Sequence, residues 1–168
     1  MKIFPTSDIA NIDRYTIHNE PISDIDLMER ASATISTYIV EKWLYKGKVM
    51  VFCGPGNNGG DGLAVARMLS KITDRFSVEV YIFDFGRELT ESTKINLDRL
   101  IKQEKALVQF SGGKESFPDI GEDLLVIDAL FGSGLNRPLE GMAASLVKHI
   151  NSSKATVISI DIPSGLMG

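Results

Sequence analysis

The chain has 168 residues, of which 43% are apolar and 24% charged, a composition typical of an ordered globular domain and not of a disordered or collagenous chain. Its length favours a single domain over residues 1–168. With 18 basic and 22 acidic residues, the net charge of −4 argues against nucleic acid or an anionic membrane as partner. The single cysteine, Cys53, excludes an internal disulfide and favours a reducing, cytoplasmic setting. No apolar run approaches the roughly 18 residues of a membrane helix.

Two helices are expected before the first strand. The first runs from Ser7 to about Asn19, and the second follows Ser23, whose spacing to Asp26 resembles a capping box. Helical spacing places one set of apolar side chains on a common face of the second helix. The members of this predicted face are Met28, Ala31, Ile35, Tyr38 and Ile39.

From Lys48 onward, short apolar runs alternate with amphipathic stretches near residues 65–72, 90–102 and 143–150. The predicted strands are Val49–Cys53, Val78–Phe83, Ala106–Phe110, Leu124–Leu130 and Thr156–Ile162. Because these runs are apolar on consecutive residues, they are typical of parallel strands that helices cover on both faces. The alternation predicts a doubly wound α/β sheet, in which ligands bind outside the carboxyl ends of the strands.

A glycine-rich segment, Gly-Pro-Gly-Asn-Asn-Gly-Gly-Asp-Gly at 54–62, follows the first predicted strand. Glycine lets the backbone approach a ligand, and the N-terminus of the next helix favours an anion such as a pyrophosphate. The alternative is a tight strand-to-helix turn without a ligand. Asn58 can cap the helix or offer an amide oxygen to a hard cation. Asp61 is interpreted as an acid that stabilises the helix through its dipole and not as a catalytic residue.

Acidic residues interrupt the fourth and fifth predicted strands. Asp128 lies in an apolar run, where a carboxylate needs a partner or a cation, and a second glycine-containing loop follows it at 132–134. Asp161 precedes Pro-Ser-Gly at 163–165 and is either a turn former or part of a site. Two acids at neighbouring strand ends, facing a glycine-rich loop, favour a site.

Several classes of catalytic site are excluded because the sequence lacks their motifs. It has no Walker lysine, nucleophile elbow or Cys/His metal set. His18 and His149 are expected on helices as surface or packed residues, and Cys53 is expected to be buried without an activating base. Asp128 and Asp161 remain as candidates for proton transfer, and Asp161 is the freer of the two if Asp128 binds a cation.

Three motifs in order along the chain resemble the signature loops of the NAD(P)H-hydrate epimerase family. They are the glycine-rich segment at 54–62, Asp-Ala-Leu-Phe-Gly-Ser-Gly-Leu at 128–135 and Asp-Ile-Pro-Ser-Gly-Leu at 161–166, and Leu-Met-Glu-Arg-Ala at 27–31 resembles the start of that family. The resemblance implies a Rossmann-like three-layer α/β/α sandwich with a mostly parallel sheet and two leading helices. The implied activity interconverts the R and S forms of hydrated NADH and NADPH in nicotinamide nucleotide repair.

The resemblance also assigns residues of this chain to the substrate and to an ion. The implied substrate-binding residues are Asn57, Asn58, Gly59, Gly60, Asp61, Gly132, Ser133, Gly134, Leu135, Asn136, Arg137, Pro138 and Asp161. A potassium ion would be bound by Asn58, Asp128 and Ser164, an all-oxygen set suited to a hard cation. Asp161 would be the catalytic residue, donating and retrieving a proton as the hydroxyl on carbon 6 of the nicotinamide ring leaves and returns.

Members of the family usually continue past the third motif with further strands and a closing helix. We therefore expect this chain, which ends at Gly168, to lack the C-terminal strands of the domain. A homodimer formed through the two leading helices is expected, as is an ATP/ADP-dependent NAD(P)H-hydrate dehydratase, fused or separate, as a partner in repair.

Two alternatives stay open at this point. Gly54, Gly56 and Gly59 satisfy G-x-G-x-x-G, and Asp84 follows about 30 residues later, so the spacing also permits an NAD-dependent oxidoreductase. Animal members of the resembling family are named for binding an apolipoprotein, so a nucleotide- or protein-binding member without turnover is the second alternative.

Overall fold

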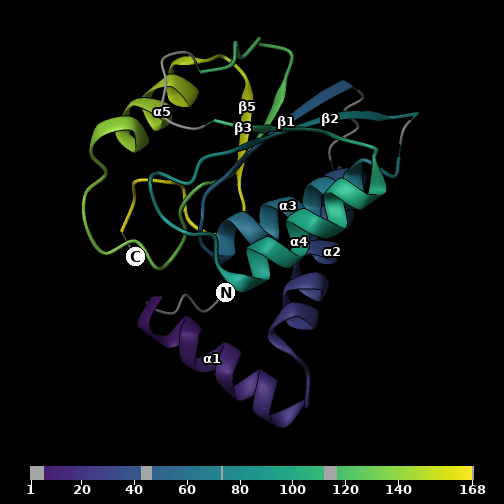
Figure 1. Cartoon of the computed structure of the whole chain (residues 1–168), viewed down its shortest axis with the longest axis vertical. Helices are drawn as coiled ribbons and strands as arrows, with labels where there is room; N and C mark the ends of the chain where they lie inside the picture. The colour runs from purple at the N-terminus through teal and green to yellow at the C-terminus, as the bar shows by residue number, and fades with distance from the viewer. Residues whose placement is uncertain (1–5, 43–46, 73, 112–116, 168) are drawn as a thin grey trace.

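The computed structural model describes residues 6–42, 47–72, 74–111 and 117–167. Two helices precede an alternation of strands and helices, as the sequence predicts (Figure 1). In chain order the elements are α1 (Thr6–Asn19), α2 (Asp24–Lys42), β1 (Gly47–Cys53), α3 (Asn57–Leu69), β2 (Phe76–Ile82), α4 (Glu91–Gln103), β3 (Leu107–Phe110), β4 (Leu125–Ala129), α5 (Gly141–Ser152) and β5 (Thr156–Ser159).

The five strands form one sheet in the order β3-β2-β1-β4-β5, and every pair in it is parallel. The central strand β1 is buried from Val49 to Cys53, consistent with its unbroken apolar run. From β1 the chain adds β2 and β3 on one side and then β4 and β5 on the other, so the topological switch point lies between β1 and β4. A crevice opens at the carboxyl ends of these two strands.

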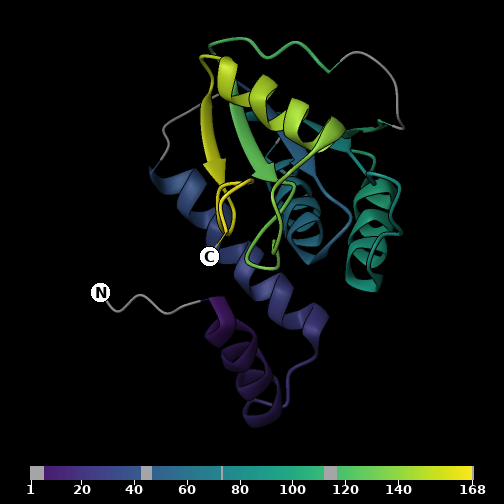
Figure 2. The ribbon, with the colours of Figure 1, turned by 90° about the vertical axis from the view of Figure 1, so that its left-hand side faces the viewer.

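Helices cover both faces of the sheet, which confirms the predicted three-layer α/β/α architecture (Figure 1). On one face α3 packs against β1, β2 and β4, with α2 and α4 against α3. On the other face, Leu146 and Ile150 of α5 pack on an aromatic cluster that includes Phe52, Tyr81 and Phe83. Figure 2 shows α1 beyond the ends toward which β4 and β5 point, and this position brings α1 to the mouth of the crevice.

The second helix begins as predicted, and Met28, Ile35 and Ile39 of its predicted apolar face are buried or packed on the core, but the other two members of that face are not. The Ser23 hydroxyl accepts the Asp26 N–H at 3.2 Å, which confirms the capping interaction. Ala31 and Tyr38 are exposed, whereas the buried residues of α2 are Met28, Ser32, Ser36 and Ile39. Close packing of α2 on α3 selects small side chains at the contact, so two serines occupy positions that hydropathy alone assigns to solvent.

Two element boundaries also differ from the predictions. The helix after the glycine-rich segment begins at Asn57, so the glycines from 59 onward belong to α3 and the connecting loop is only Gly54–Gly56. The last strand ends at Ser159 and not at Ile162, because its ladder partner β4 reaches no further than Ala129 and the register pairs Asp128 with Ser159. Asp161 therefore lies in the turn after β5.

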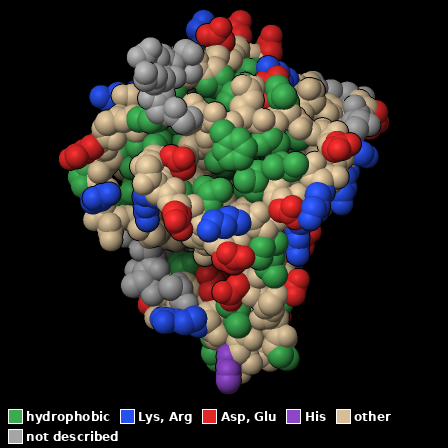
Figure 3. Space-filling view, in the orientation of Figure 1, with side chains coloured by type: hydrophobic (Ala, Val, Ile, Leu, Met, Phe, Trp, Pro, Cys, Tyr) green, Lys and Arg blue, Asp and Glu red, His purple; other side chains and the backbone are tan. Residues whose placement is uncertain are grey.

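The edge strand β3 leaves apolar side chains in solvent. Leu107 is 54% exposed and Phe110 is 64% exposed. Figure 3 shows apolar side chains gathered near the middle of one face, over the region of β3, with charged side chains of both signs around them. None of the helices in the described ranges is long and apolar enough to cross a membrane.

Candidate active site

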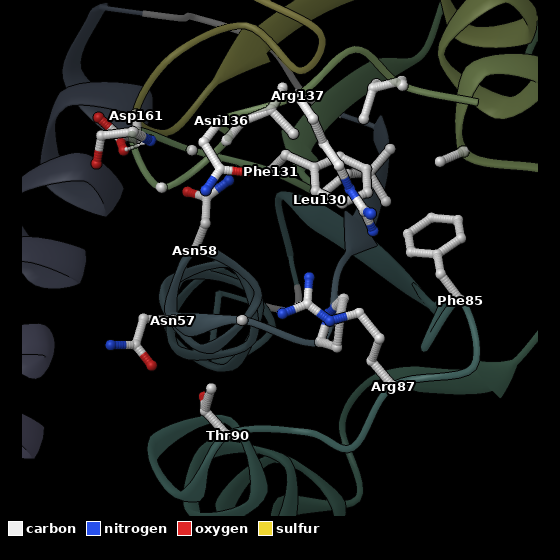
Figure 4. A pocket seen from close by; sticks show the side chains of 18 of the residues that line it. Asn57, Asn58, Phe85, Arg87, Thr90, Leu130, Phe131, Asn136, Arg137 and Asp161 are labelled. Atoms are coloured by element: carbon white, nitrogen blue, oxygen red, sulfur yellow. Dashed lines mark hydrogen bonds between the residues drawn. The ribbon is translucent and has the colours of Figure 1, made fainter. Parts of the chain in front are cut away.

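A cavity of about 900 Å³ lies at the carboxyl ends of the parallel strands. Its walls come from α1, the turn after β1, the loops after β2 and β4, and the turn after β5 (Figure 4). The structure brings most of the predicted substrate-binding residues to this cavity: Asn57, Asn58, Asp61, Gly132, Ser133, Gly134, Leu135, Asn136, Arg137, Pro138 and Asp161 all line it. Gly59 and Gly60 do not line the described cavity; both are buried in α3.

The glycines of the first motif serve two different purposes. A Cβ on Gly54 would lie 1.9 Å from the carbonyl oxygen of Leu130, and a Cβ on Gly59 would lie 1.9 Å from the carbonyl oxygen of Gly54. A Cβ on Gly62 would lie 2.4 Å from the Cβ of Ala129. Gly54 therefore lets the turn after β1 pack against the backbone at the end of β4, and Gly59 and Gly62 let α3 pack against that turn and the sheet.

Gly56 differs from the other glycines of the motif because nothing lies within 4 Å of the place where its Cβ would be. It lines the cavity and is the N-cap of α3, in an extended conformation and without a side-chain cap. The N–H groups of Gly59 and Gly60 bond the carbonyl oxygen of Gly56, so the donors that the helix leaves for a ligand are the N–H groups of Asn57 and Asn58, at the positive end of its dipole. The open space at Gly56 thus lies beside a group of donors suited to an anion.

Asp128 is buried, with 6% of its surface exposed, and it finds its partners in the turn after β5. Its Oδ1 accepts the hydroxyl of Ser164 at 2.6 Å, and its Oδ2 accepts the backbone N–H of Ser164 at 2.8 Å. The hydroxyl of Ser159 and the N–H of Leu130 complete the set at 3.1 and 3.2 Å. These four donors satisfy the carboxylate within the chain, which answers the expectation that Asp128 needs a partner.

Asn58 is the one predicted ion ligand whose polar atoms are left unsatisfied. Neither its amide oxygen nor its amide nitrogen has a hydrogen-bond partner among the described residues, although both atoms are buried. An unsatisfied buried amide costs about 1–3 kcal/mol. Figure 4 shows this side chain pointing from the start of α3 into the cavity. Together with the oxygens of Asp128 and Ser164, the donor set fits a hard cation.

Asp161 is held against the loop that follows β4. Its Oδ2 accepts the backbone N–H of Ser133 at 2.6 Å. A Cβ on Gly132 would lie 2.5 Å from the same oxygen, so the glycine leaves the room in which the carboxylate sits. The contact between residues 28 apart in the sequence joins the second and third motifs into one wall of the cavity.

The carboxyl group of Asp61, which lies after the first turn of α3, has a raised pKa. Burial, and after it the negative charges of Asp161 and Asp13, raise its pKa to about 7, against a hydrogen bond with Ser32 that lowers it. Near neutral pH a large fraction of Asp61 is therefore protonated. Dipole stabilisation of the helix, the role predicted for Asp61, needs an ionised carboxylate, so the structure points instead to a group that can hold a proton.

Several residues that line the cavity have no motif in the sequence. Ile9 and Asp13 come from α1, Phe85 and Arg87 from the loop after β2, and Thr90 from the start of α4. Spacing could have found the segment after β2, because every strand end of a doubly wound sheet faces the same crevice. The position of α1 depends on packing between distant elements and left no local signal.

The remaining predictions about reactive side chains are confirmed. Cys53 is fully buried, and burial raises the pKa of its thiol. His18 is exposed, and His149 is packed against Phe117 with its ring nitrogen 2.9 Å from the carbonyl oxygen of Pro118. Asp84, which the oxidoreductase alternative requires as a ribose ligand, accepts the N–H of Gly86 within its own turn and does not line the described cavity.

Relatives named for acting on hydrated nicotinamide nucleotides match most of this chain. The NAD(P)H-hydrate epimerase of Rhodobacter capsulatus is 33% identical over 171 residues, which cover 98% of this chain and 77% of that protein. The NAD(P)H-hydrate epimerase of Limosilactobacillus fermentum is 36% identical over 155 residues, covering 92% of this chain and 70% of that protein.

A bifunctional NAD(P)H-hydrate repair enzyme of Thermofilum pendens is 38% identical over 172 residues, but these are only 32% of that protein. The chain thus spans about a third of the length of the bifunctional relatives. A yeast protein of known crystal structure shares the fold, with a TM-score of 0.80 and 23% identity over 98% of this chain and 72% of that one. The family described as the YjeF-related protein N-terminus matches residues 24–168. The chain therefore belongs to the YjeF-related N-terminal domain family, to which its resemblance to the NAD(P)H-hydrate epimerases pointed.

Proposed function

We propose that the chain is an NAD(P)H-hydrate epimerase, an isomerase that interconverts the R and S forms of hydrated NADH and NADPH. The observation that carries this proposal is the meeting of all three motifs in one cavity, in a chain related over nearly its whole length to proteins named for that activity. The cavity combines a helix start suited to an anion with the carboxyl groups of Asp61 and Asp161, as a dinucleotide and a proton transfer require.

Epimerisation at carbon 6 needs the hydroxyl to leave and return. The C–O bond breaks as the hydroxyl takes a proton and departs as water, while the lone pair of the ring nitrogen forms a double bond to carbon 6. Water then adds to either face of the planar ring and gives up one proton. The group that supplies and recovers this proton must be available in both forms near neutral pH.

We assign this proton to the pair Asp61 and Asp161. Both line the cavity, and the charge of Asp161 contributes to the raised pKa of Asp61. Asp161, held by the Ser133 N–H, lies against the loop after β4, and Asp61 approaches from α3. The charge of Asp161 favours the protonated form of Asp61, so Asp61 can hold a proton for the leaving hydroxyl and take it back.

The test starts from the pure R hydrate of NADPH and follows the R to S ratio by chromatography. Asp161→Asn and Asp61→Asn should each slow equilibration by at least about a hundredfold, within the range usual for loss of acid–base catalysis. Glu91→Gln, an exposed acid at the start of α4, is the matched control. Wild-type protein that leaves the R to S ratio at the background rate would contradict the proposed activity, and unchanged rates in both variants would contradict the assigned residues.

We further propose a potassium ion held by Asn58, Asp128 and Ser164. When bound, it would place a positive charge beside the buried Asp128 carboxylate. Its support is the buried Asn58 amide that has no hydrogen-bond partner among the described residues, together with the oxygen ligands that Asp128 and Ser164 would offer to a hard cation. Rates measured in potassium chloride should exceed those in choline chloride of equal ionic strength, and Asn58→Leu should remove the difference. Equal rates in the two salts would remove the ion from the proposal.

The chain is also proposed to form a homodimer in the cytoplasm, through the exposed faces of its two leading helices. Ile12 is 43% exposed, Tyr15 is 69% exposed and Tyr38 is 54% exposed, and a second copy covering them would bury this apolar surface. Tyr15→Glu together with Tyr38→Glu should then halve the mass in sedimentation equilibrium. A wild-type chain that sediments as a monomer would exclude the dimer.

The bifunctional relatives support a proposal that a dehydratase acts on the same substrate.

A further inference from the structure

Two arginines reach the cavity from opposite loops. Arg87 follows β2 and Arg137 follows β4, and both line the cavity. Figure 4 shows the two guanidinium groups directed into the space between them. Within the ranges that the structure describes, neither guanidinium forms an ion pair or a hydrogen bond. Two unpaired cations at one end of a cavity leave a position for an anion.

The turn that carries Arg87 is built to fix its direction. Phe85 has φ +50° and Gly86 has φ +72°, the backbone of a type I′ turn, and the N–H of Arg87 closes it on the carbonyl oxygen of Asp84 at 2.9 Å. A positive φ is strained for an aromatic residue, and such strain concentrates at functional sites. The Phe85 ring stacks on Phe131 with 5.2 Å between centroids, so the turn is anchored to the loop after β4.

Three of the acidic side chains of the cavity lie together, and the positive groups lie on another side of it. Asp61 and the two carboxylates that raise its pKa, Asp13 and Asp161, lie near one another, and Figure 4 shows Asp161 across the cavity from Arg87. Glu140 is the fourth acid in the wall. On the side of Arg87 the helix α4 begins, where Thr90 lines the cavity and its N–H binds the carbonyl oxygen of Pro55 at 2.9 Å. The positive end of a helix dipole adds to the two arginines there.

We propose that Arg87, together with Arg137, binds a phosphate group of the hydrated dinucleotide and so fixes the substrate with its nicotinamide end toward Asp161. The inference rests on the proposed function and adds a residue that none of the three motifs contains. Guanidinium groups pair with phosphate through two parallel hydrogen bonds. In dinucleotide-binding folds an arginine near the end of the second strand accommodates the 2′-phosphate that distinguishes NADP from NAD. The phosphate is therefore either this 2′-phosphate or the pyrophosphate.

The test measures kcat and KM of wild type, Arg87→Gln and Arg87→Lys with NADPH hydrate and NADH hydrate in separate assays. Arg87→Gln should raise KM about tenfold with kcat little changed, which is the loss expected for one charge-assisted contact. Arg87→Lys should raise KM less than Arg87→Gln does, because it keeps the positive charge. A rise confined to NADPH hydrate identifies the 2′-phosphate, and an equal rise with both substrates identifies the pyrophosphate. Lys105→Gln, an exposed lysine between α4 and β3, is the charge-matched control.

A KM for both substrates that matches the Lys105→Gln control would overturn the proposal, as would a loss confined to kcat. A binding measurement separates this outcome from failure of the proposed function. ADP-ribose and 2′-phospho-ADP-ribose carry the phosphates without the reacting ring, and their affinity can be measured by calorimetry. If wild type binds either compound and Arg87→Gln binds it about tenfold more weakly, the phosphate site stands whether or not the hydrates are turned over.

Discussion

Replacing Asp61 by asparagine should make the protein more stable at neutral pH, and the gain should disappear in acid. The change keeps the shape of the protonated carboxyl while removing its ability to ionise. Burial and the charges of Asp161 and Asp13 raise the pKa of Asp61 from 3.8 to about 7. A difference of one pKa unit between folded and unfolded states is worth about 1.4 kcal/mol.

The sign and size of the effect follow from proton linkage. Below about pH 4, Asp61 is protonated in both states and the two proteins differ by a constant. As pH rises from about 4 to about 7, the unfolded chain releases the proton while the folded chain retains it, so the wild type loses stability relative to the variant. The loss amounts to at most about 4 kcal/mol, because part of the carboxyl reaches solvent in the cavity. That is a large share of the roughly 5–15 kcal/mol that stabilises a domain of this kind.

Urea unfolding followed by circular dichroism at several values between pH 4 and pH 8 gives the free energy of unfolding of each protein. Asp161→Asn provides a second measurement, because removing that charge should bring the pKa of Asp61 down and narrow the pH range of the loss. Stability curves of wild type and Asp61→Asn that run parallel from pH 4 to pH 8 would refute the raised pKa, and with it the proton assigned to this carboxyl.

Gly132→Ala should lower turnover by at least about tenfold, because its Cβ would lie 2.5 Å from Oδ2 of Asp161 and push the carboxylate from its position. Gly121→Ala, away from the cavity lining and with only an ordinary contact to Leu124 at 3.8 Å, should stay within about twofold of wild type, and kinetics on the R hydrate compare the two. Cys53 should resist alkylation by iodoacetamide in the native protein and react only when the chain unfolds in urea, because burial raises the pKa of its thiol; mass spectrometry detects the adduct.

The sequence predicts the elements of this fold well where local pattern and tertiary packing agree. The central strands are apolar on consecutive residues, and the structure buries them within one or two residues of the predicted ends. The prediction is wrong at the end of β5. The apolar run continues to Ile162, but β5 ends at Ser159 because its partner strand β4 ends there in the register of the sheet. The prediction is also wrong on α2, where Ser32 and Ser36 are buried because a close helix contact requires small side chains.

The site was only partly predictable for the same reason. Asp128 stands out in the sequence as an acid in an apolar run, but its partner Ser164 lies 36 residues away and is brought to it by the turn after β5. At Asp61 the local pattern predicts only a helix-stabilising acid, because the charges that alter its pKa come from α1 and from that same turn. A local pattern can mark a polar residue in an unusual place, but it cannot supply the neighbours that decide its protonation.

The glycine-rich motif shows how packing and ligand binding can be separated within one pattern. Five glycines in nine residues predict a loop that a ligand approaches, yet Gly54, Gly59 and Gly62 are required by close packing among the end of β4, the turn after β1 and α3. An alanine at any of these three positions should destabilise the fold whether or not a ligand binds. Gly56→Ala has no such cost in the free protein, because its Cβ would stand in open space. If the dinucleotide approaches the start of α3, that Cβ meets the substrate and not the protein, so Gly56→Ala should raise KM while leaving the unfolding free energy within about 1 kcal/mol of wild type.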